Sequence, residues 1–153
     1  MMDSSKTGFL FSVLMVGLIA CSDDRLSSAD PSNLEHVALG KTVYDQHCAS
    51  CHGNDLQGQD NWRKRGPDGK LPAPPHDDSG HTWHHPDKVL FEIVKKGMVP
   101  PYAPENYQTN MQGWGDQLTD EQIWAVLAFI KSRWSDESRR VQRGIDENAR
   151  RQE

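Results

Sequence analysis

The sequence is poor in cysteine, in apolar residues and in excess positive charge. Of its 153 residues only 3 are cysteine and 35% are hydrophobic, and the formal net charge is -5. The low apolar content limits the chain to one modest core, and the mild negative charge argues against a nucleic-acid partner. There is no second C-x-x-C pair, which excludes a zinc site built from two such pairs.

The chain also lacks an apolar run suited to a relaxed membrane span. The run Gly8–Ala20 is too short for one but fits the core of a signal peptide. It ends in Leu18-Ile19-Ala20-Cys21, which resembles the lipobox of bacterial lipoproteins. We therefore expect a signal peptide at 1–20, a lipid on Cys21, a flexible tether at 21–33, and a bacterial envelope location facing the periplasm or cell exterior. The alternatives are an uncleaved anchor or an exported protein with a free Cys21.

The motif that points most directly to chemistry is Cys48-Ala49-Ser50-Cys51-His52. Its spacing is that of a c-type haem attachment site, in which two thiols add to the haem vinyl groups and the histidine binds the iron. A thioredoxin-like C-x-x-C would follow a strand, whereas Cys48 follows a helix-like stretch. The motif predicts one covalently attached haem c, bound through Cys48, Cys51 and His52.

Three helices are predicted around this motif. The first runs from about Leu34 to Gln46 and contains Gly40, which allows another backbone to approach closely. The second begins with Pro86 at its first position and stops at Gly97. The third begins at the capping-box pattern Thr119-Asp120-Glu121-Gln122 and carries apolar residues as far as Trp134. The expected fold class is therefore all-α.

These segments together resemble the class I cytochromes c. The resemblance lies in Gly40–Cys48, in Cys51-His52-Gly53 and in Leu118–Ser132, and it covers about residues 34–134. It implies a small fold of about three main helices packed around one haem. It also implies a non-enzymatic carrier that passes single electrons between redox partner proteins, with no small-molecule substrate.

An electron-transfer haem usually has a second strong axial ligand, and methionine is the favoured donor. Met98 and Met111 are the candidates outside the amino-terminal segment. The stretch Asn110–Leu118 resembles the family loop that carries the axial methionine, although Gln112 stands where the family more often has proline. Met111 is therefore the predicted ligand.

The proximal histidine needs a hydrogen-bond acceptor for its other ring nitrogen. In class I cytochromes c a proline-containing loop supplies a backbone carbonyl, and Ala73-Pro74-Pro75 occupies the matching stretch. Either proline fits this role, and Pro75 is the one predicted.

Two further readings of the sequence belong to other functional classes. A five-coordinate haem would bind a gas or act on peroxide. A copper-handling module would use the imidazoles of the patch His76, His81, His84 and His85, one of which is also an alternative sixth haem ligand. The remaining segment, 135–153, is rich in both charges and lacks an apolar stripe, which predicts a helical extension or disorder.

Overall fold

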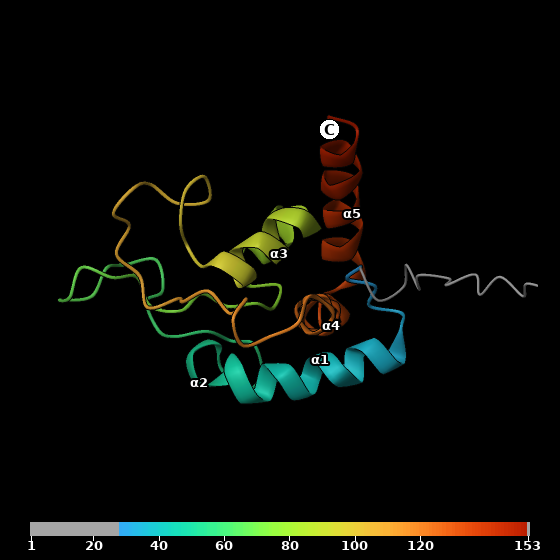
Figure 1. Ribbon diagram of the computed structural model, residues 1–153, viewed down its shortest axis with the longest axis horizontal. Helices are drawn as coiled ribbons and strands as arrows, with labels where there is room; N and C mark the ends of the chain where they lie inside the picture. The colour runs from blue at the N-terminus through green and yellow to red at the C-terminus, as the bar shows by residue number, and fades with distance from the viewer. Residues whose placement is uncertain (1–27, 153) are drawn as a thin grey trace, which may run out of the picture.

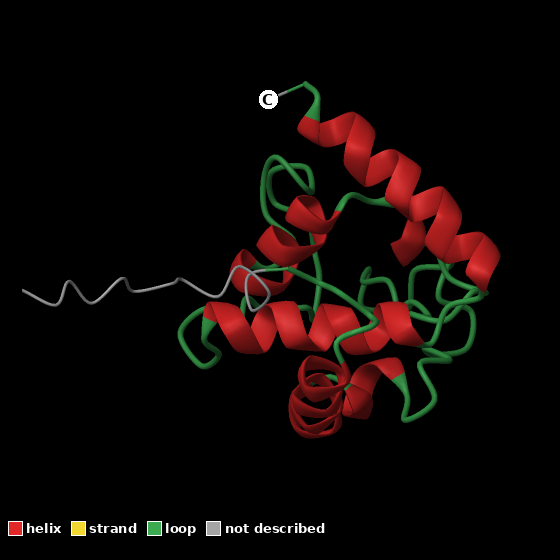
Figure 2. Ribbon diagram, turned by 90° about the vertical axis from the view of Figure 1, so that its right-hand side faces the viewer, coloured by secondary structure: helices red, strands yellow, loops and turns green. Residues whose placement is uncertain are grey.

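The computed structural model describes residues 28–152, and within this range the chain forms helices and loops without strands (Figures 1 and 2). The predicted all-α class is confirmed. The predicted signal peptide, Cys21 and most of the predicted tether lie outside the described residues. At the end of that tether, Ala29 is buried against the core. Within residues 28–152 no helix has the length and apolar character needed to cross a membrane.

Helices α1 and α4 form the centre of the fold. Helix α1 (Leu34–His47) begins after Asn33, whose side chain accepts a hydrogen bond from the His36 N–H. Helix α4 (Asp120–Ser132) begins with the predicted capping box, in which Thr119 and Gln122 satisfy each other's backbone N–H groups. Most of the α4 side chains from Ile123 onward are buried, because the helix lies between α1 and the other elements (Figure 1).

The contact between α1 and α4 depends on a glycine, as the sequence predicted. A Cβ atom on Gly40 would lie 1.9 Å from the carbonyl oxygen of Ala125. Beside this contact the rings of Tyr44 and Phe129 pack with centroids 5.3 Å apart. The two helix backbones therefore approach closely enough for large side chains to close the core around their crossing.

Helix α3 (Asp87–Lys96) packs against α4 through stacked rings of Phe91 and Trp124, whose centroids are 4.3 Å apart. Pro86 is the residue before the helix, so the predicted start is off by one position. Gly97 ends the helix with φ +83°, a conformation that favours glycine.

Helix α5 (Asp136–Arg150) follows α4 and packs against the short helix η2 (Thr82–His84). Its buried positions are Ser138, Gln142 and Asp146, which are all polar. Gln142 Nε2 donates to Asp87 Oδ1 over 2.7 Å, and the Asp87 N–H donates to Asp146 over 2.9 Å. These hydrogen bonds hold the helix together with the half-buried apolar residues Val141 and Ile145.

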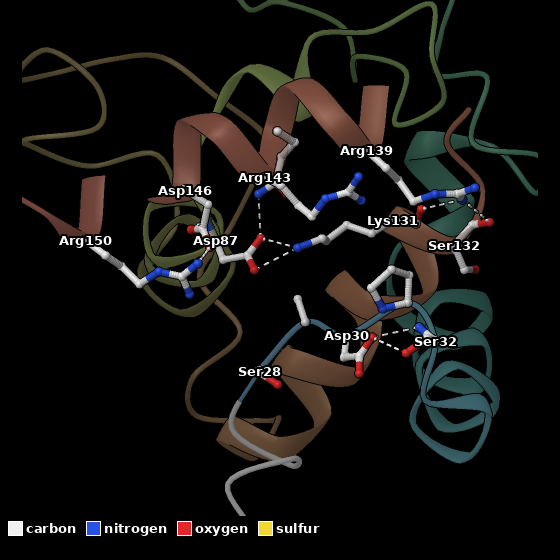
Figure 3. Close-up of a pocket in the computed structure, with 13 residues that line it drawn as sticks. Ser28, Asp30, Ser32, Asp87, Lys131, Ser132, Arg139, Arg143, Asp146 and Arg150 are labelled. Carbon is white, nitrogen blue, oxygen red and sulfur yellow. Dashed lines mark hydrogen bonds and ion pairs between the residues drawn. The ribbon is translucent and has the colours of Figure 1, made fainter. Parts of the chain in front are cut away.

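A polar cavity of about 630 Å³ lies between α5, the end of α4 and residues 28–32 (Figure 3). At its floor the Lys131 Nζ atom lies 2.7 Å from both carboxylate oxygens of Asp87, and both side chains are largely buried. Burial raises the pKa of Asp87, while the neighbouring Lys131 opposes that rise. This ion pair joins α3 to α4 beneath α5.

Candidate haem site

The C-x-x-C-H motif lies at the end of α1 and in the short helix α2 (Ala49–His52). The N–H groups of Cys51 and His52 both donate to the Cys48 carbonyl, over 3.1 and 2.9 Å. Residues three apart in a helical turn share one side, so both thiols face the same region. Both thiols are free, with Cys48 partly buried and Cys51 exposed.

The chemistry of Cys48 is not that of a thioredoxin-like thiol. Burial, with a smaller effect of the nearby Cys51, raises the pKa of Cys48 to about 12. Reactive thiols of C-x-x-C redox centres have lowered pKa values instead. Before haem attachment this environment favours the neutral thiol of Cys48, which disfavours a dithiol redox function.

His52 is buried, and its Nδ1 atom lies 2.9 Å from the backbone oxygen of Pro74. Burial lowers the pKa of His52, and the hydrogen bond to Pro74 acts in the opposite direction. The ring is therefore a neutral imidazole whose Nδ1–H donates to Pro74. This tautomer leaves the Nε2 lone pair available for a metal, which is the arrangement of metal-bound histidines.

The acceptor is Pro74, one residue before the predicted Pro75. The Pro75 carbonyl instead lies against Gly80, where a Cβ atom would approach its oxygen to 2.1 Å. Consecutive carbonyls of an extended proline pair point in different directions, so only one of them can face His52. The sequence identifies the loop but not which of its two adjacent prolines faces the ring.

Gly58 fixes the position of this proline loop. Its N–H donates to the His52 carbonyl over 2.8 Å, and its φ is +69°. A Cβ atom there would lie 2.4 Å from the Pro75 nitrogen. On the other side of the motif, the Tyr44 hydroxyl donates to the Gly53 carbonyl over 2.8 Å. The motif is therefore tied both to α1 and to the proline loop.

Met111 lies in the loop between α3 and α4, where it is partly buried. Its N–H donates to Thr109 Oγ1 over 2.9 Å, and Lys70 Nζ bonds the preceding residue, Asn110, over 2.6 Å. Three residues after Met111, the Trp114 ring packs against the His47 ring with centroids 5.1 Å apart.

His47 directly precedes Cys48, so this contact brings the Met111 loop beside the attachment motif. Met98 is also partly buried and follows Gly97, which packs against the same loop near Gly113.

The histidines of the predicted patch pack against different aromatic residues and do not converge on one point. The His81 ring stacks on Trp62 at 5.3 Å, and the His85 ring meets His81 edge-on at 5.6 Å. The His84 ring packs on Trp83 at 3.8 Å. Within residues 28–152, no group of three or more histidine, cysteine or acidic side chains is arranged to hold a metal ion.

His76 is separate from the rest of that patch and lies against the haem motif. Its ring stacks on the His52 ring with centroids 4.0 Å apart and an angle of 23° between the planes. Burial lowers the pKa of His76 well below the usual histidine value, with smaller effects of His52 and His81. Sequence reasoning missed this contact because nothing in the local pattern around His76 indicates a partner in α2.

The side chains at the motif fit a covalent haem. Neither cysteine is in a disulfide, the two lie one helical turn apart, and the adjacent buried imidazole is oriented through Nδ1 so that Nε2 remains available. An all-α fold with this site defines a small c-type haem protein.

Comparison with known proteins agrees with this class. Residues 37–134 match the family Cytochrome c, and the chain belongs to this family. Its cofactor is accordingly one covalently bound haem c, and its general function is electron transfer.

Two curated relatives are subunits of cbb3-type cytochrome c oxidases. The chain is 32% identical over 94 residues to subunit CcoP from Azospirillum sp. (strain B510), which covers 61% of this chain and 27% of the relative. It is 24% identical over 96 residues to subunit FixP from Sinorhizobium medicae (strain WSM419), which covers 63% of this chain and 29% of the relative. The similarity therefore spans less than a third of either relative.

Proposed function

We propose that this protein is a class I electron carrier whose haem iron is bound by His52 on one side and by Met111 on the other. The hydrogen bond from His52 Nδ1–H to the Pro74 carbonyl carries the proposal, because it fixes the tautomer that a ligand histidine requires. The haem, when bound, takes up and releases one electron at a time.

Met111 is preferred to Met98 as the second ligand because of how its loop is held. The Trp114 ring packs on His47, the residue before Cys48, and Asn110 is bonded by Lys70. The loop is thus attached on one side of Met111 to Lys70 and on the other side to the residue that precedes the motif. A ligand held in this way keeps its position in both oxidation states, so little rearrangement accompanies electron transfer.

The surrounding residues serve to hold the ligands. Pro74 orients the His52 ring, Gly58 allows the proline loop to approach, and Tyr44 fixes the end of the motif through Gly53. Burial of His52 keeps water from competing for its hydrogen bond. Each of these groups holds an iron ligand or a segment beside it, which is the role that a carrier requires of them.

Membrane attachment through a lipid on Cys21 is part of the proposal. Helix α1 has 14 residues, which makes it roughly 21 Å long. Residues 28–33 precede this helix and Cys48 follows it, so the tether enters at one end and the haem attaches at the other (Figure 1). From Cys21 to Ser28 the chain spans at most roughly 25 Å. Such a tether would keep the domain near the envelope membrane and let it turn to meet its redox partners.

The relatives suggest the kind of partner. Both are subunits of cbb3-type oxidases, so we propose that this chain exchanges electrons with respiratory proteins at the outer face of the bacterial membrane. Contacts of this kind are weak and short-lived, since a carrier must dissociate as readily as it binds.

Carbon monoxide tests the proposal against a five-coordinate haem. The holoprotein of the full chain is reduced with dithionite, exposed to carbon monoxide, and followed by its Soret band. A six-coordinate carrier refuses the gas or binds it over minutes, because Met111 must first leave the iron. Binding within the mixing time would instead assign a gas-binding or peroxidase-like function.

A further inference from the structure

His76 is held firmly behind the haem motif by its own backbone. Its N–H donates to the Leu56 carbonyl over 2.7 Å, and its carbonyl accepts from the Trp134 indole N–H over 2.7 Å. Leu56 and Trp134 are both buried, with 1% and 2% of their surface exposed. The backbone at this position is therefore fixed to the core from both sides.

The side chain of His76 is fixed as well. One face of the ring lies on His52 at 4.0 Å, and Nδ1 lies 2.8 Å from the Thr82 hydroxyl oxygen. An apolar residue would fill the same space without defining a ring plane. The imidazole, by contrast, has its rotation set by the bond to Thr82, so its flat face stays turned toward His52.

Thr82 in turn is supported by the carboxyl-terminal helix. It is 6% exposed and lies in η2, against which α5 packs. Helix α5 lies beyond residues 37–134, the part of the chain that matches the family. A chain of contacts thus runs from α5 through Thr82 and His76 to His52.

The Pro74 hydrogen bond alone leaves the His52 ring some freedom to swing, because hydrogen bonds tolerate a range of angles. The His76 ring blocks that motion on one face, since a swing of the His52 plane would bring the stacked rings into collision. We propose that His76, supported by Thr82, is a positioning residue that fixes the plane of the His52 imidazole at the haem. This inference rests on the proposed role of His52 as an iron ligand.

The orientation of an axial imidazole is read directly in the oxidised holoprotein. Haem methyl proton shifts and the EPR g-values both depend on the direction of the ligand plane, whereas overall stability does not set them. The variants are His76→Leu, which removes the ring, and Thr82→Val, which removes only its hydrogen-bond partner. Thr82→Ser keeps the hydroxyl, and His84→Leu removes an exposed imidazole that packs on Trp83.

We expect His76→Leu and Thr82→Val to change the order or spread of the haem methyl shifts, with the midpoint potential shifting as well. Thr82→Ser and His84→Leu should reproduce the wild-type pattern. If Thr82→Val gives wild-type methyl shifts and g-values in a folded holoprotein, the proposal is wrong. If His76→Leu fails to fold, Thr82→Val alone tests the positioning role of His76.

His52→Ala separates this failure from failure of the proposed function. If His52→Ala keeps the wild-type EPR spectrum, His52 is not a ligand and both proposals fall. If His52→Ala loses that spectrum while His76→Leu and Thr82→Val keep it, only the positioning role is overturned.

Discussion

The carbonyl oxygen of Ala125 lies where a side chain on Gly40 would begin, 1.9 Å from the position of a Cβ atom. This relationship sets the distance between α1 and α4, and therefore the position of the Cys48–His52 motif at the end of α1. The haem site thus depends on a contact within the body of the fold.

Gly40→Ala should destabilise the protein by about 3 kcal/mol, because backbone atoms of α4 cannot move aside without separating the helices. Gly144→Ala is the matched control, since no heavy atom lies within 4 Å of its added Cβ in helix α5. That control should raise stability by about 0.5–1 kcal/mol. Urea unfolding followed by circular dichroism measures both, and equal stabilities for the two variants would show that the close approach is unimportant.

Gly58→Ala should raise the midpoint potential of the haem. The added Cβ would displace the Pro75 nitrogen and with it the Pro74 carbonyl, so His52 loses a hydrogen bond that makes it a stronger donor to ferric iron. A hydrogen bond of about 1 kcal/mol corresponds to roughly 40 mV for one electron.

The control is Gly69→Ala, which also has a positive φ, of +76°, but no atom within 4 Å of the added Cβ. It carries the same backbone strain without moving Pro74. Redox titration measures the midpoint potential of both holoproteins. An equal change of potential in the two variants would show that the Pro74 hydrogen bond does not set it.

Met111→Ala should abolish the weak long-wavelength absorption band of the Fe–S bond in the oxidised protein. It should also open the iron to carbon monoxide, because the sixth position loses its resident ligand. Met98→Ala is the matched comparison and should retain both the band and the slow response to carbon monoxide. The reverse outcome, with the band lost in Met98→Ala and kept in Met111→Ala, would reassign the ligand.

Lys131→Met should destabilise the protein by roughly 3–5 kcal/mol at neutral pH, because Asp87 is left as a buried charge without its partner. Burial already raises the pKa of Asp87, and removing Lys131 raises it further. The folded state then binds a proton that the unfolded state releases. Stability is therefore higher below the raised pKa and falls as pH increases through it.

Urea unfolding at pH 5 and pH 7 measures whether the free energy of unfolding falls as pH increases. Lys131→Met should be relatively more stable at pH 5, and the double variant Asp87→Asn with Lys131→Met should lose most of that pH dependence. A Lys131→Met protein that gains stability on going from pH 5 to pH 7 would contradict the assignment.

Much of the fold could be predicted because its signals are local. The capping box at Thr119 and Gln122, the stop at Gly97 and the close approach at Gly40 each follow from the residue type and its immediate neighbours. The attachment motif is equally local, since its spacing alone specifies the chemistry.

The features that escaped prediction depend on contacts distant in sequence. Helix α5 packs through buried Ser138, Gln142 and Asp146, whose partners lie in distant segments, so the burial of these polar side chains could not be predicted from the local pattern. The choice of Pro74 over Pro75 depends on the turn set by Gly58, and the stack of His76 on His52 joins separate segments. Such contacts become visible only when the chain is folded.

Spectro-electrochemical titration of the holoprotein, with the spin state followed by magnetic circular dichroism in both oxidation states, shows whether His52 and Met111 both bind the iron. We expect one reversible one-electron transition and a low-spin, six-coordinate iron with a histidine and a methionine ligand before and after reduction. A high-spin iron in either state, or loss of an axial ligand on reduction, would contradict it.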